Sequence, residues 1–401
     1  MNFEQISGGV TAPKGFKASG VRCGLKKINK KDLAIVFSEA QAQSAGVFTR
    51  NTIAAAPVVV SKKHLSSGLC RAVVINSGCA NAFTGQRGLE NSVSMAKSVA
   101  AKLDIENRDV LVASTGVIGE FLPMDKIEKG IAQACRELSA SGDSDAAEAI
   151  MTTDTFSKQV AVEFQLAGNT VRVGAMAKGA GMIAPNMATM LAFITTDIKI
   201  DHLLLRTCLK EAVAKSFNMI TVDGETSTND MVIVLANGLS EVSLADTDTG
   251  SGIFKEALEF VCSALAKMIV RDGEGATKFV ELTVKGANNS EEARQIGMAI
   301  ANSILVKTAF YGEDANLGRI IAAAGHAGVD IDSMQVELFF SSEKVAEAGA
   351  YLDFDESKVN LALKEKEFEF TVVIGKGPGE ATIWTTDLSH EYVDINAHYR
   401  T

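Results

Sequence analysis

The chain has 401 residues, of which 47% are hydrophobic and 34 are glycines. A chain of this length and composition can bury a large core, either as one big domain or as two ordinary ones. Its 49 acidic and 39 basic residues give a net charge of −10 and include no basic stripe between aromatic residues, which argues against nucleic acid as a partner.

The first half of the chain is expected to hold short strands followed by helices. Runs of β-branched residues bounded by turn residues predict strands over residues 32–39, 45–51, 56–64, 70–78 and 107–119. Apolar residues at helical spacing predict helices over 89–104 and 125–139, with Asp125 as the N-cap of the second helix.

The second half is expected to contain longer helices between strands. The same criteria predict strands over 190–198, 231–238, 368–375 and 381–388, and helices over 201–217, 253–270, 290–310 and 317–328. No proline- or glycine-rich linker divides the chain, and we interpret the polar segment 243–252 as a surface turn. Helices that cover the outer faces of stacked sheets would give an α+β fold.

The sequence also predicts a cytoplasmic protein without a metal centre or a membrane partner. No stretch approaches the apolar length of a membrane helix, and the first twenty residues lack the pattern of a secretory signal. The six cysteines stand singly, and the five histidines form no pair at metal-ligand spacing. We therefore expect reduced core cysteines and no zinc site.

A threonine at the start of a predicted strand is the strongest candidate for chemistry. Thr189 directly follows Ala188, and a glycine-rich stretch beginning at Lys178 precedes them. A flexible turn that leads into a rigid strand can strain the Ala188–Thr189 peptide bond, and the hydroxyl could then attack the Ala188 carbonyl. Hydrolysis of the resulting ester would leave Thr189 as a new N-terminus. The alternative is an ordinary strand threonine.

An N-terminal threonine would be an activated nucleophile, because its own α-amine can take the hydroxyl proton. The unperturbed pKa of such an amine is about 7.7–8.0, and a nearby ammonium such as that of Lys178 would lower it further. The alternative is that Lys178 is a solvated loop residue. The residues alone leave both interpretations open.

Eight motifs lie in order along the whole chain: GGVTAPKGFKASGV, NSGCANAFTG, STGVIG, MTTDTFSK, KGAGMIAPNMATMLAFITTD, VDGETSTND, RDGEGATKF and YVDINAHYRT. Together they resemble the motifs of the ornithine acetyltransferase family, the glutamate N-acetyltransferases of arginine biosynthesis. The segment KGAGMIAPNMATMLAFITTD is similar to the self-cleavage segment of that family. WTTDL at 384–388 departs from the family, where WGCDL is frequent.

The resemblance implies a layered αββα sandwich of the ornithine acetyltransferase and self-processing aminopeptidase type. It implies cleavage into residues 1–188 and 189–401, two interwoven chains that form one enzyme unit, with two such pairs in a heterotetramer. It further implies ping-pong transfer of acetyl from N2-acetylornithine to L-glutamate through acetyl-Thr189, without a cofactor. Whether acetyl-CoA is a second acetyl donor is left open.

The resemblance also assigns roles to residues of this sequence. It implies Thr189 as nucleophile, with Thr115 and Gly116 as the donors that stabilise the oxyanion. The substrate-binding residues that it implies are Thr152, Lys178, Thr189, Glu274, Asn396 and Thr401. Glu274 could instead be a surface turn acid, and the C-terminal residues could be frayed. A related hydrolase, or an uncleaved amino-acid-binding module, remain the alternative functions.

Overall fold

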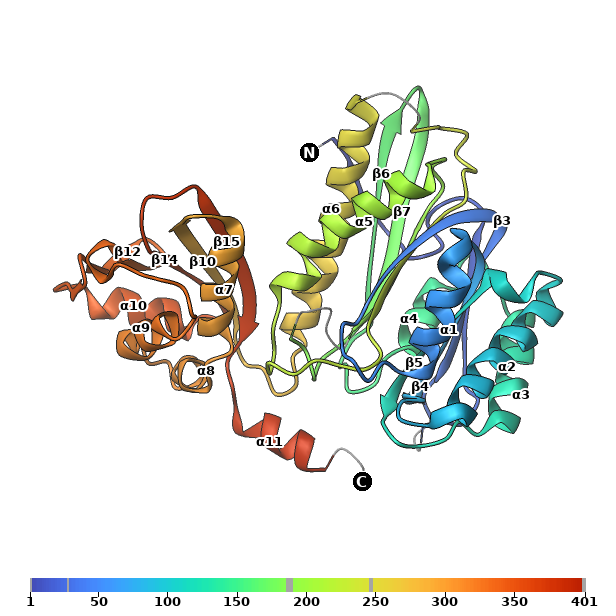
Figure 1. The fold of residues 1–401 in the computed structure, drawn as a ribbon, viewed down its shortest axis with the longest axis horizontal. Coiled ribbons are helices and arrows are strands. Elements are labelled where there is room, and N and C mark those ends of the chain that lie inside the picture. Colours follow the sequence, from blue (N-terminus) through green and yellow to red (C-terminus); the bar gives the residue numbers. More distant parts are fainter. Residues whose placement is uncertain (1, 27–28, 185–189, 245–247, 399–401) are drawn as a thin grey trace. The chain divides into compact units, whose positions relative to one another are not determined.

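The structure is a computed structural model that describes residues 2–26, 29–184, 190–244 and 248–398 (Figure 1). The chain forms two compact units. Unit 1 comprises residues 1–182, 186–218 and 225–269, and unit 2 comprises 183–185, 219–224 and 270–401. The chain therefore crosses between the units several times rather than at one linker.

Unit 1 is built on a sheet of nine described strands in the order β1-β6-β7-β8-β9-β3-β4-β5, with β2 paired to β3. The strands are β1 (Glu4–Ile6), β2 (Phe16–Val21), β3 (Leu33–Phe48), β4 (Leu69–Cys79), β5 (Val110–Val117), β6 (Lys158–Leu166), β7 (Asn169–Lys178), β8 (Leu191–Thr196) and β9 (Met231–Ala236). Its helices are α1 (Ala56–His64), α2 (Gly85–Leu103), α3 (Met124–Arg136), α4 (Asp143–Ala149), α5 (His202–Lys215) and α6 (Asp248–Arg271).

The long strand β3 folds this sheet into two layers. Residues 33–38 pair with β2, residues 33–37 and 42–43 pair with β4, and residues 43–48 pair with β9. The register between β3 and β4 shifts between Phe37 and Ala42, just before the residues that pair with β9. A single core joins the facing sides of the layers, with Ile75 from β4 and Phe193 from β8 among its members.

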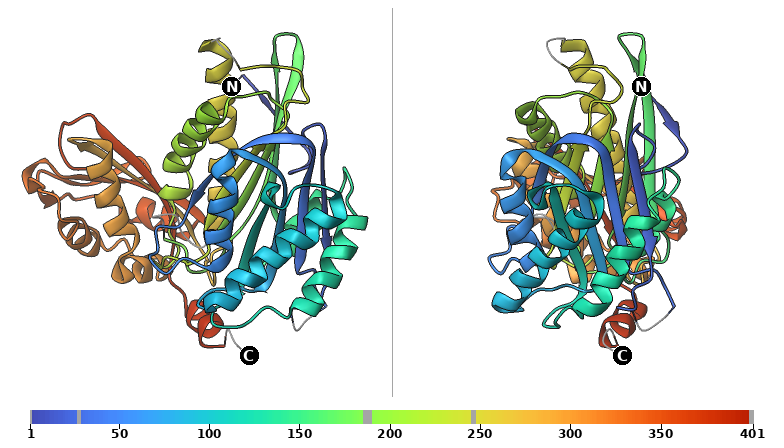
Figure 2. Two further views of the ribbon diagram at one scale, coloured as in Figure 1. Left: turned by 45° about the vertical axis from the view of Figure 1, so that its right-hand side comes forward. Right: turned by 90° about the vertical axis from the view of Figure 1, so that its right-hand side faces the viewer.

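Helices cover both outer faces of unit 1. On one side, α2 and α3 pack on the outward residues of β3, β4 and β5, so that Met95 and Ile127 share a core with Val74. Helices α5 and α6 lie on the opposite side (Figure 2), where His202 Nδ1 of α5 is 3.0 Å from the Ser44 carbonyl. The expected α+β fold with αββα layers is confirmed.

Unit 2 contains a second sheet with helices packed against it. Its six described strands follow the order β13-β12-β11-β14-β10-β15. They are β10 (Phe279–Ala287), β11 (Glu337–Phe340), β12 (Glu343–Glu347), β13 (Ala350–Tyr351), β14 (Glu367–Val373) and β15 (Gly379–Thr386). The helices are α7 (Ser290–Ala301), α8 (Ile304–Tyr311), α9 (Leu317–Gly325), α10 (Glu356–Lys364) and α11 (His390–Ala397).

The prediction of a strand over 56–64 was wrong, because this segment is helix α1. Pro57 lies at the start of the helix, where its missing N–H costs nothing and its fixed φ favours the first turn. The helix then docks on β5, since Ser61 Oγ donates to the Val112 carbonyl at 2.7 Å and accepts from the Val112 N–H at 2.8 Å. Side-chain docking of this kind overrides the β propensity of three consecutive valines.

Two helix ends also differ from prediction. Helix α3 begins after Pro123 and has no side-chain N-cap, so Asp125 lies within its first turn. The single helix expected over 290–310 is two helices, because Ser303 begins α8 by accepting a hydrogen bond from the Val306 N–H. The hairpin of β6 and β7 was not among the predicted elements. Its two turn residues, Ala167 and Gly168, both have a positive φ, 52° and 82°.

Candidate active site

The predicted site residues fall into three groups. Ala188, Thr189 and Thr401 lie outside the described residues. Thr115, Gly116, Thr152 and Lys178 belong to unit 1, and Glu274 and Asn396 belong to unit 2.

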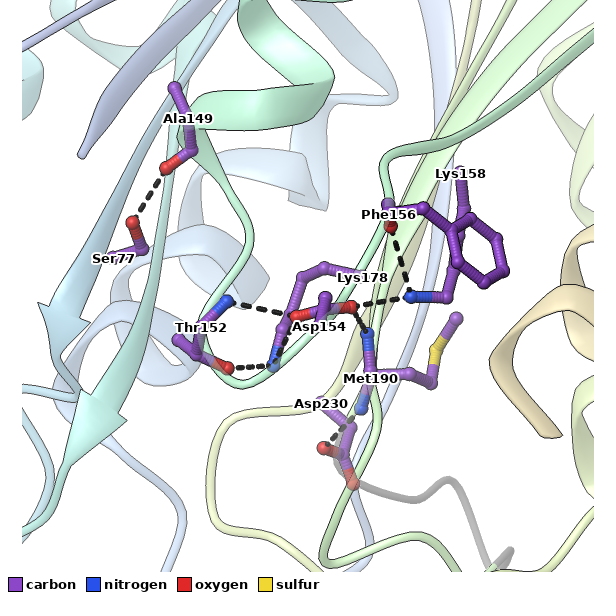
Figure 3. Close-up of polar contacts among 10 residues, drawn as sticks. Ser77, Ala149, Thr152, Asp154, Phe156, Lys158, Lys178, Met190 and Asp230 are labelled. Atoms are coloured by element: carbon purple, nitrogen blue, oxygen red, sulfur yellow. Dashed lines mark hydrogen bonds and ion pairs between the residues drawn. The ribbon is translucent and has the colours of Figure 1, made fainter. Parts of the chain in front are cut away.

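Two buried aspartates hold the chain on either side of the predicted nucleophile (Figure 3). Lys178 ends β7 and pairs directly with Leu191 of β8. Just beyond Lys178, the Gly179 N–H donates to Asp154 Oδ1 at 2.7 Å. On the other side, the Met190 N–H donates to Asp230 Oδ1 at 3.1 Å. Residues 179 and 190 are thus fixed to the sheet by carboxyl groups.

Asp154 lies at the centre of a buried charge network. Its Oδ1 is 2.7 Å from Lys158 Nζ, and neither side chain is exposed to solvent. Its Oδ2 accepts the Thr152 N–H at 2.8 Å and lies 3.8 Å from Lys178 Nζ. The Lys178 ammonium in turn donates to Thr152 Oγ1 at 2.7 Å. The structure therefore brings together Thr152 and Lys178, which the resemblance assigns to substrate binding, and places Asp154 and Lys158 beside them.

The charges of this network determine its protonation state. Burial alone would raise the pKa of Asp154, but Lys178, Lys158 and the Gly179 N–H outweigh it, so the pKa of Asp154 is held well below its ordinary value. The opposite holds at Asp230, whose burial outweighs the neighbouring donors and raises its pKa well above the ordinary value. Of the two aspartates that hold the chain, one is charged and the other favours the neutral form.

Thr115 and Gly116 lie at the end of β5, where they pair with Ser77 and Gly78 of β4. Asn229 connects this end to the segment that leads into β9. Its Nδ2 donates to the carbonyls of Ser114 at 2.9 Å and Ala80 at 2.7 Å. Asn229 directly precedes Asp230, which accepts the Met190 N–H. The end of β5 that bears Thr115 and Gly116 is therefore connected through Asn229 to the residue that holds Met190.

Gly116 is predicted to be irreplaceable for steric reasons. Its φ is +130°, and an added Cβ would lie 2.3 Å from the Gly78 carbonyl carbon. We expect Gly116→Ala to lower the free energy of unfolding by about 3 kcal/mol or more, from backbone strain plus overpacking. Gly119→Ala is the matched control, since Gly119 also has a positive φ, +86°, but nothing within 4 Å of an added Cβ. Equal losses in urea unfolding would contradict the role of the close contact.

In unit 2, the structure brings Glu274 and Asn396 together. Asn396 Nδ2 donates to Glu274 Oε2 at 2.9 Å, and Glu274 is only 9% exposed. Gly275, with a φ of +66°, allows this approach, because an added Cβ would lie 2.5 Å from the Tyr392 N. Ser389 Oγ also donates to the Gly275 carbonyl at 2.6 Å. Glu274 is thus no surface acid, and Asn396 belongs to helix α11 rather than to a frayed end.

Unit 2 also buries a lysine that no site prediction included. Lys307 Nζ on α8 lies near Thr385 Oγ1 at 3.1 Å and Thr386 Oγ1 at 3.0 Å, in the WTTDL segment that departs from the family pattern. Burial lowers the pKa of Lys307 to about 7, although Asp387 and Asp223 oppose the shift. The two threonines therefore supply acceptors to a lysine that burial drives toward its neutral form.

We expect unit 2 to become more stable as the pH rises from about 7 to about 10. The folded pKa of Lys307 lies below the unfolded value of about 10.4, so unfolding takes up a proton throughout that range. The single tryptophan, Trp384, precedes Thr385, and its fluorescence during urea unfolding reports on this region. Lys307→Met should abolish the rise. The same pH dependence in both proteins would contradict the assignment.

Sequence reasoning selected the motifs that hold Asp154, Lys158, Asn229 and Asp230, but gave these four residues no role. In the sequence, each of these four charged or amide residues lies among hydroxyl-bearing and small residues. The same pattern is typical of exposed turns. Only tertiary structure places them at 0–4% exposure.

Among the described residues, no group of three or more His, Cys, Asp or Glu side chains could hold a metal ion. No helix in the described ranges is long and apolar enough to cross a membrane.

Comparison with known proteins decides the family. The model of the ArgJ family matches residues 17–401. This chain belongs to the ArgJ family. The resemblance drawn from the motifs is thereby confirmed, since it named the same family of arginine biosynthesis.

Individual relatives agree with the family match. The chain is 49% identical over 404 residues to the arginine biosynthesis bifunctional protein ArgJ of Caldanaerobacter subterraneus subsp. tengcongensis, with 100% of both chains covered. It is 46% identical to the ArgJ protein of Bacillus subtilis, covering 99% of this chain and 98% of the relative. A solved ornithine acetyltransferase from Mycobacterium tuberculosis, complexed with ornithine, is 44% identical, with a TM-score of 0.43 over 46% of this chain and 98% of the solved one.

Proposed function

We propose that this ArgJ protein is a glutamate N-acetyltransferase of arginine biosynthesis, which transfers the acetyl group of N2-acetylornithine to L-glutamate. Full-length similarity to bifunctional arginine biosynthesis proteins supports this function. The observation that carries the site is the buried Lys178 ammonium, held by Thr152 and Asp154 at the strand end eleven residues before Thr189. A cytoplasmic location is part of the same proposal.

We further propose that the chain cleaves itself between Ala188 and Thr189. The support is local: the N–H groups of Gly179 and Met190, on either side of the bond, each donate to a buried aspartate, Asp154 before β6 and Asp230 before β9. Fixed ends can hold the intervening peptide in a geometry that favours attack by the Thr189 hydroxyl. Cleavage would give chains of residues 1–188 and 189–401, and two such pairs would form the heterotetramer.

The reaction that follows has two symmetrical halves. The Thr189 hydroxyl attacks the acetyl carbonyl carbon, and the α-amine of Thr189 accepts the hydroxyl proton. Collapse of the tetrahedral intermediate breaks the bond to the N2 nitrogen of ornithine, which leaves with that proton. Glutamate then attacks the acetyl ester through its α-amine, and the hydroxyl of Thr189 is restored. The Thr115 hydroxyl and the Gly116 N–H would stabilise both oxyanions.

Binding in this proposal uses groups that suit amino-acid substrates. Lys178 and Thr152 can hold an α-carboxylate, which both substrates carry. Glu274, oriented by Asn396, can accept the cationic δ-amine of ornithine. Thr401 joins this set by family resemblance. Because relatives are named bifunctional, we include acetyl-CoA as a second donor to glutamate.

The fate of an isotope-labelled acetyl group tests this function against its alternatives. The enzyme is incubated with acetyl-labelled N2-acetylornithine, with and without glutamate. We expect label on glutamate in step with ornithine release, and no sustained turnover without glutamate. Label appearing as acetate would identify a hydrolase, and tight binding without release of ornithine would identify a binding module. Labelled acetyl-CoA replaces acetylornithine in a second series.

A further inference from the structure

One short segment of unit 2, residues 386–389, lies against the turn that bears Glu274. The segment runs from the last residue of β15 to the residue before helix α11. The turn connects α6 to β10, far away along the chain. The sequence analysis gave no residue of this segment a role, yet its contacts converge on the neighbours of Glu274.

Asp387 holds the end of this turn by three hydrogen bonds. Its Oδ1 accepts the N–H groups of Thr277 at 2.8 Å and Lys278 at 3.0 Å. Its Oδ2 accepts the hydroxyl of Thr277 at 2.5 Å. Asp387 is only 3% exposed, so water competes little for these bonds. They fix the backbone just after Glu274.

Two further residues of the segment contact the residues on either side of Glu274. Ser389 Oγ donates to the Gly275 carbonyl at 2.6 Å. A Cβ added to Gly273 would lie 3.0 Å from Thr386 Cγ2, so Thr386 packs directly against Gly273. Glu274 is therefore held at the residue before it, at the residue after it and at the end of its turn, all by the same segment.

The buried Lys307 of α8 holds this segment in turn. Its ammonium donates to Thr386 Oγ1 at 3.0 Å, and its backbone carbonyl accepts the Leu388 N–H at 3.2 Å. Leu388 lies between Asp387 and Ser389, the two residues that hydrogen-bond to the turn. Lys307 therefore acts on the turn through the segment.

The side chain of Glu274 has one carboxyl oxygen left for a ligand. Oε2 accepts the Asn396 amide at 2.9 Å, and helix α11, which carries Asn396, begins directly after Ser389. Oε1 makes no hydrogen bond with any residue that the structure describes. Because the segment fixes both the turn and the start of α11, it determines where Oε1 lies.

We propose that Asp387 is a positioning residue that makes the site specific for a cationic acetyl donor, by holding Glu274 Oε1 where it meets the δ-amine of ornithine. This inference rests on the proposed function, in which Glu274 accepts that amine. N-acetylglutamate, the donor when the second half-reaction runs in reverse, ends in a carboxylate instead. A displaced Oε1 therefore removes a charge-assisted hydrogen bond from N2-acetylornithine alone. The competing interpretation is that Asp387 only stabilises unit 2.

A comparison of the two donors separates these interpretations. Each donor is supplied with isotope-labelled glutamate as acceptor, and the label that appears in N-acetylglutamate gives kcat/KM for that donor. We expect Asp387→Ala to lower the ratio of kcat/KM for N2-acetylornithine to that for N-acetylglutamate by about tenfold. Asp387→Asn keeps an acceptor for both N–H groups and should keep the ratio within about threefold of wild type. A purely structural role would lower both kcat/KM values together and leave the ratio unchanged.

Asp355 provides the matched control in the same unit. It also accepts the N–H and the hydroxyl of one residue, Ser357, at 3.0 Å and 2.5 Å, at the start of α10. Asp355→Ala should leave the donor ratio unchanged, and an equal fall in this variant would contradict the proposal. Thr277→Val, at an exposed position, removes only the hydroxyl bond to Asp387 and should lower the ratio by about threefold.

The outcomes distinguish the inference from the function on which it rests. A folded Asp387→Ala protein with the wild-type donor ratio overturns the inference. If this variant does not fold, a wild-type ratio in Thr277→Val overturns it instead. Glu274→Gln should lower the ratio by about 10- to 100-fold, and a wild-type ratio there would refute both the binding of the δ-amine by Glu274 and this inference. Absence of transfer from N2-acetylornithine in the wild type would refute the proposed function itself.

Discussion

The Thr189→Ala variant is expected to keep the full 42.3 kDa mass and to show no acetyl transfer. Alanine has no hydroxyl to attack the Ala188 carbonyl, so neither the new N-terminus nor the acetyl-enzyme can form. The expected loss of kcat approaches the whole enzymatic rate enhancement, which is at least about 10⁶-fold. Mass spectrometry of the denatured protein measures the cleavage, and the labelled-acetyl assay measures the transfer.

Thr189→Ser is the control for this experiment. Serine keeps the hydroxyl and removes only a methyl group, so we expect two fragments and measurable transfer at a reduced rate. A wild-type protein that stays uncleaved after prolonged incubation would refute self-processing. Cleavage of Thr189→Ala at the same bond would assign the processing to another residue.

Asp154→Asn is expected to cause the largest loss of stability. The change removes the buried negative charge that lies 2.7 Å from Lys158 Nζ and 3.8 Å from Lys178 Nζ. Removing one member of a buried ion pair costs about 3–5 kcal/mol. Urea unfolding measures this loss, and acetyl transfer should fall as well because Lys178 loses a neighbour that holds it.

An exposed ion pair gives the comparison for Asp154. Lys215 and Glu259 lie 2.8 Å apart with side chains 63% and 40% exposed. Glu259→Gln should change the unfolding free energy by less than about 1 kcal/mol. Similar effects of the two substitutions would mean that the Asp154 network contributes no more than a surface pair.

The Asp154 network also has a defined pH dependence. Because the folded pKa of Asp154 is lowered, its stabilising contribution is complete above about pH 4 and is lost as the pH falls below that value. The Asn variant lacks this contribution, so the difference in stability between the two proteins should narrow in acid. A constant difference down to low pH would show that Asp154 is not charged in the folded protein.

Local sequence patterns were sufficient for most elements and for part of the site. Alternating or helical spacing of apolar residues located β4, α5 and α6, because burial of one face determines both pattern and structure. The strand predicted over 56–64 was wrong, because Pro57 favours the start of a helix and Ser61 docks that helix on β5. These contacts overcome the β propensity of the valines. The division into two units could not be predicted, since residues 183–185 and 219–224 join unit 2 without any compositional mark.

The site divides in the same way. The resemblance assigned Thr152 and Lys178 to substrate binding, and the structure places Lys178 Nζ 2.7 Å from Thr152 Oγ1. The sequence did not predict roles for Asp154 and Asp230. Asp154 is a charged ion-pair partner, whereas burial raises the pKa of Asp230, although both are aspartates. That difference depends on burial and on neighbours up to forty residues away along the chain. No single-residue pattern contains this information.

The strand order of unit 1 determines what a cut at residue 188 would leave behind. Strands β8 and β9 follow the cut, yet they lie between β7 and β3, which both precede it. The two pieces would form a noncovalent complex that cannot dissociate without opening two strand ladders and exposing their edges. Refolding of the cut protein would then be bimolecular and concentration-dependent, whereas the uncut chain would refold at a rate independent of concentration.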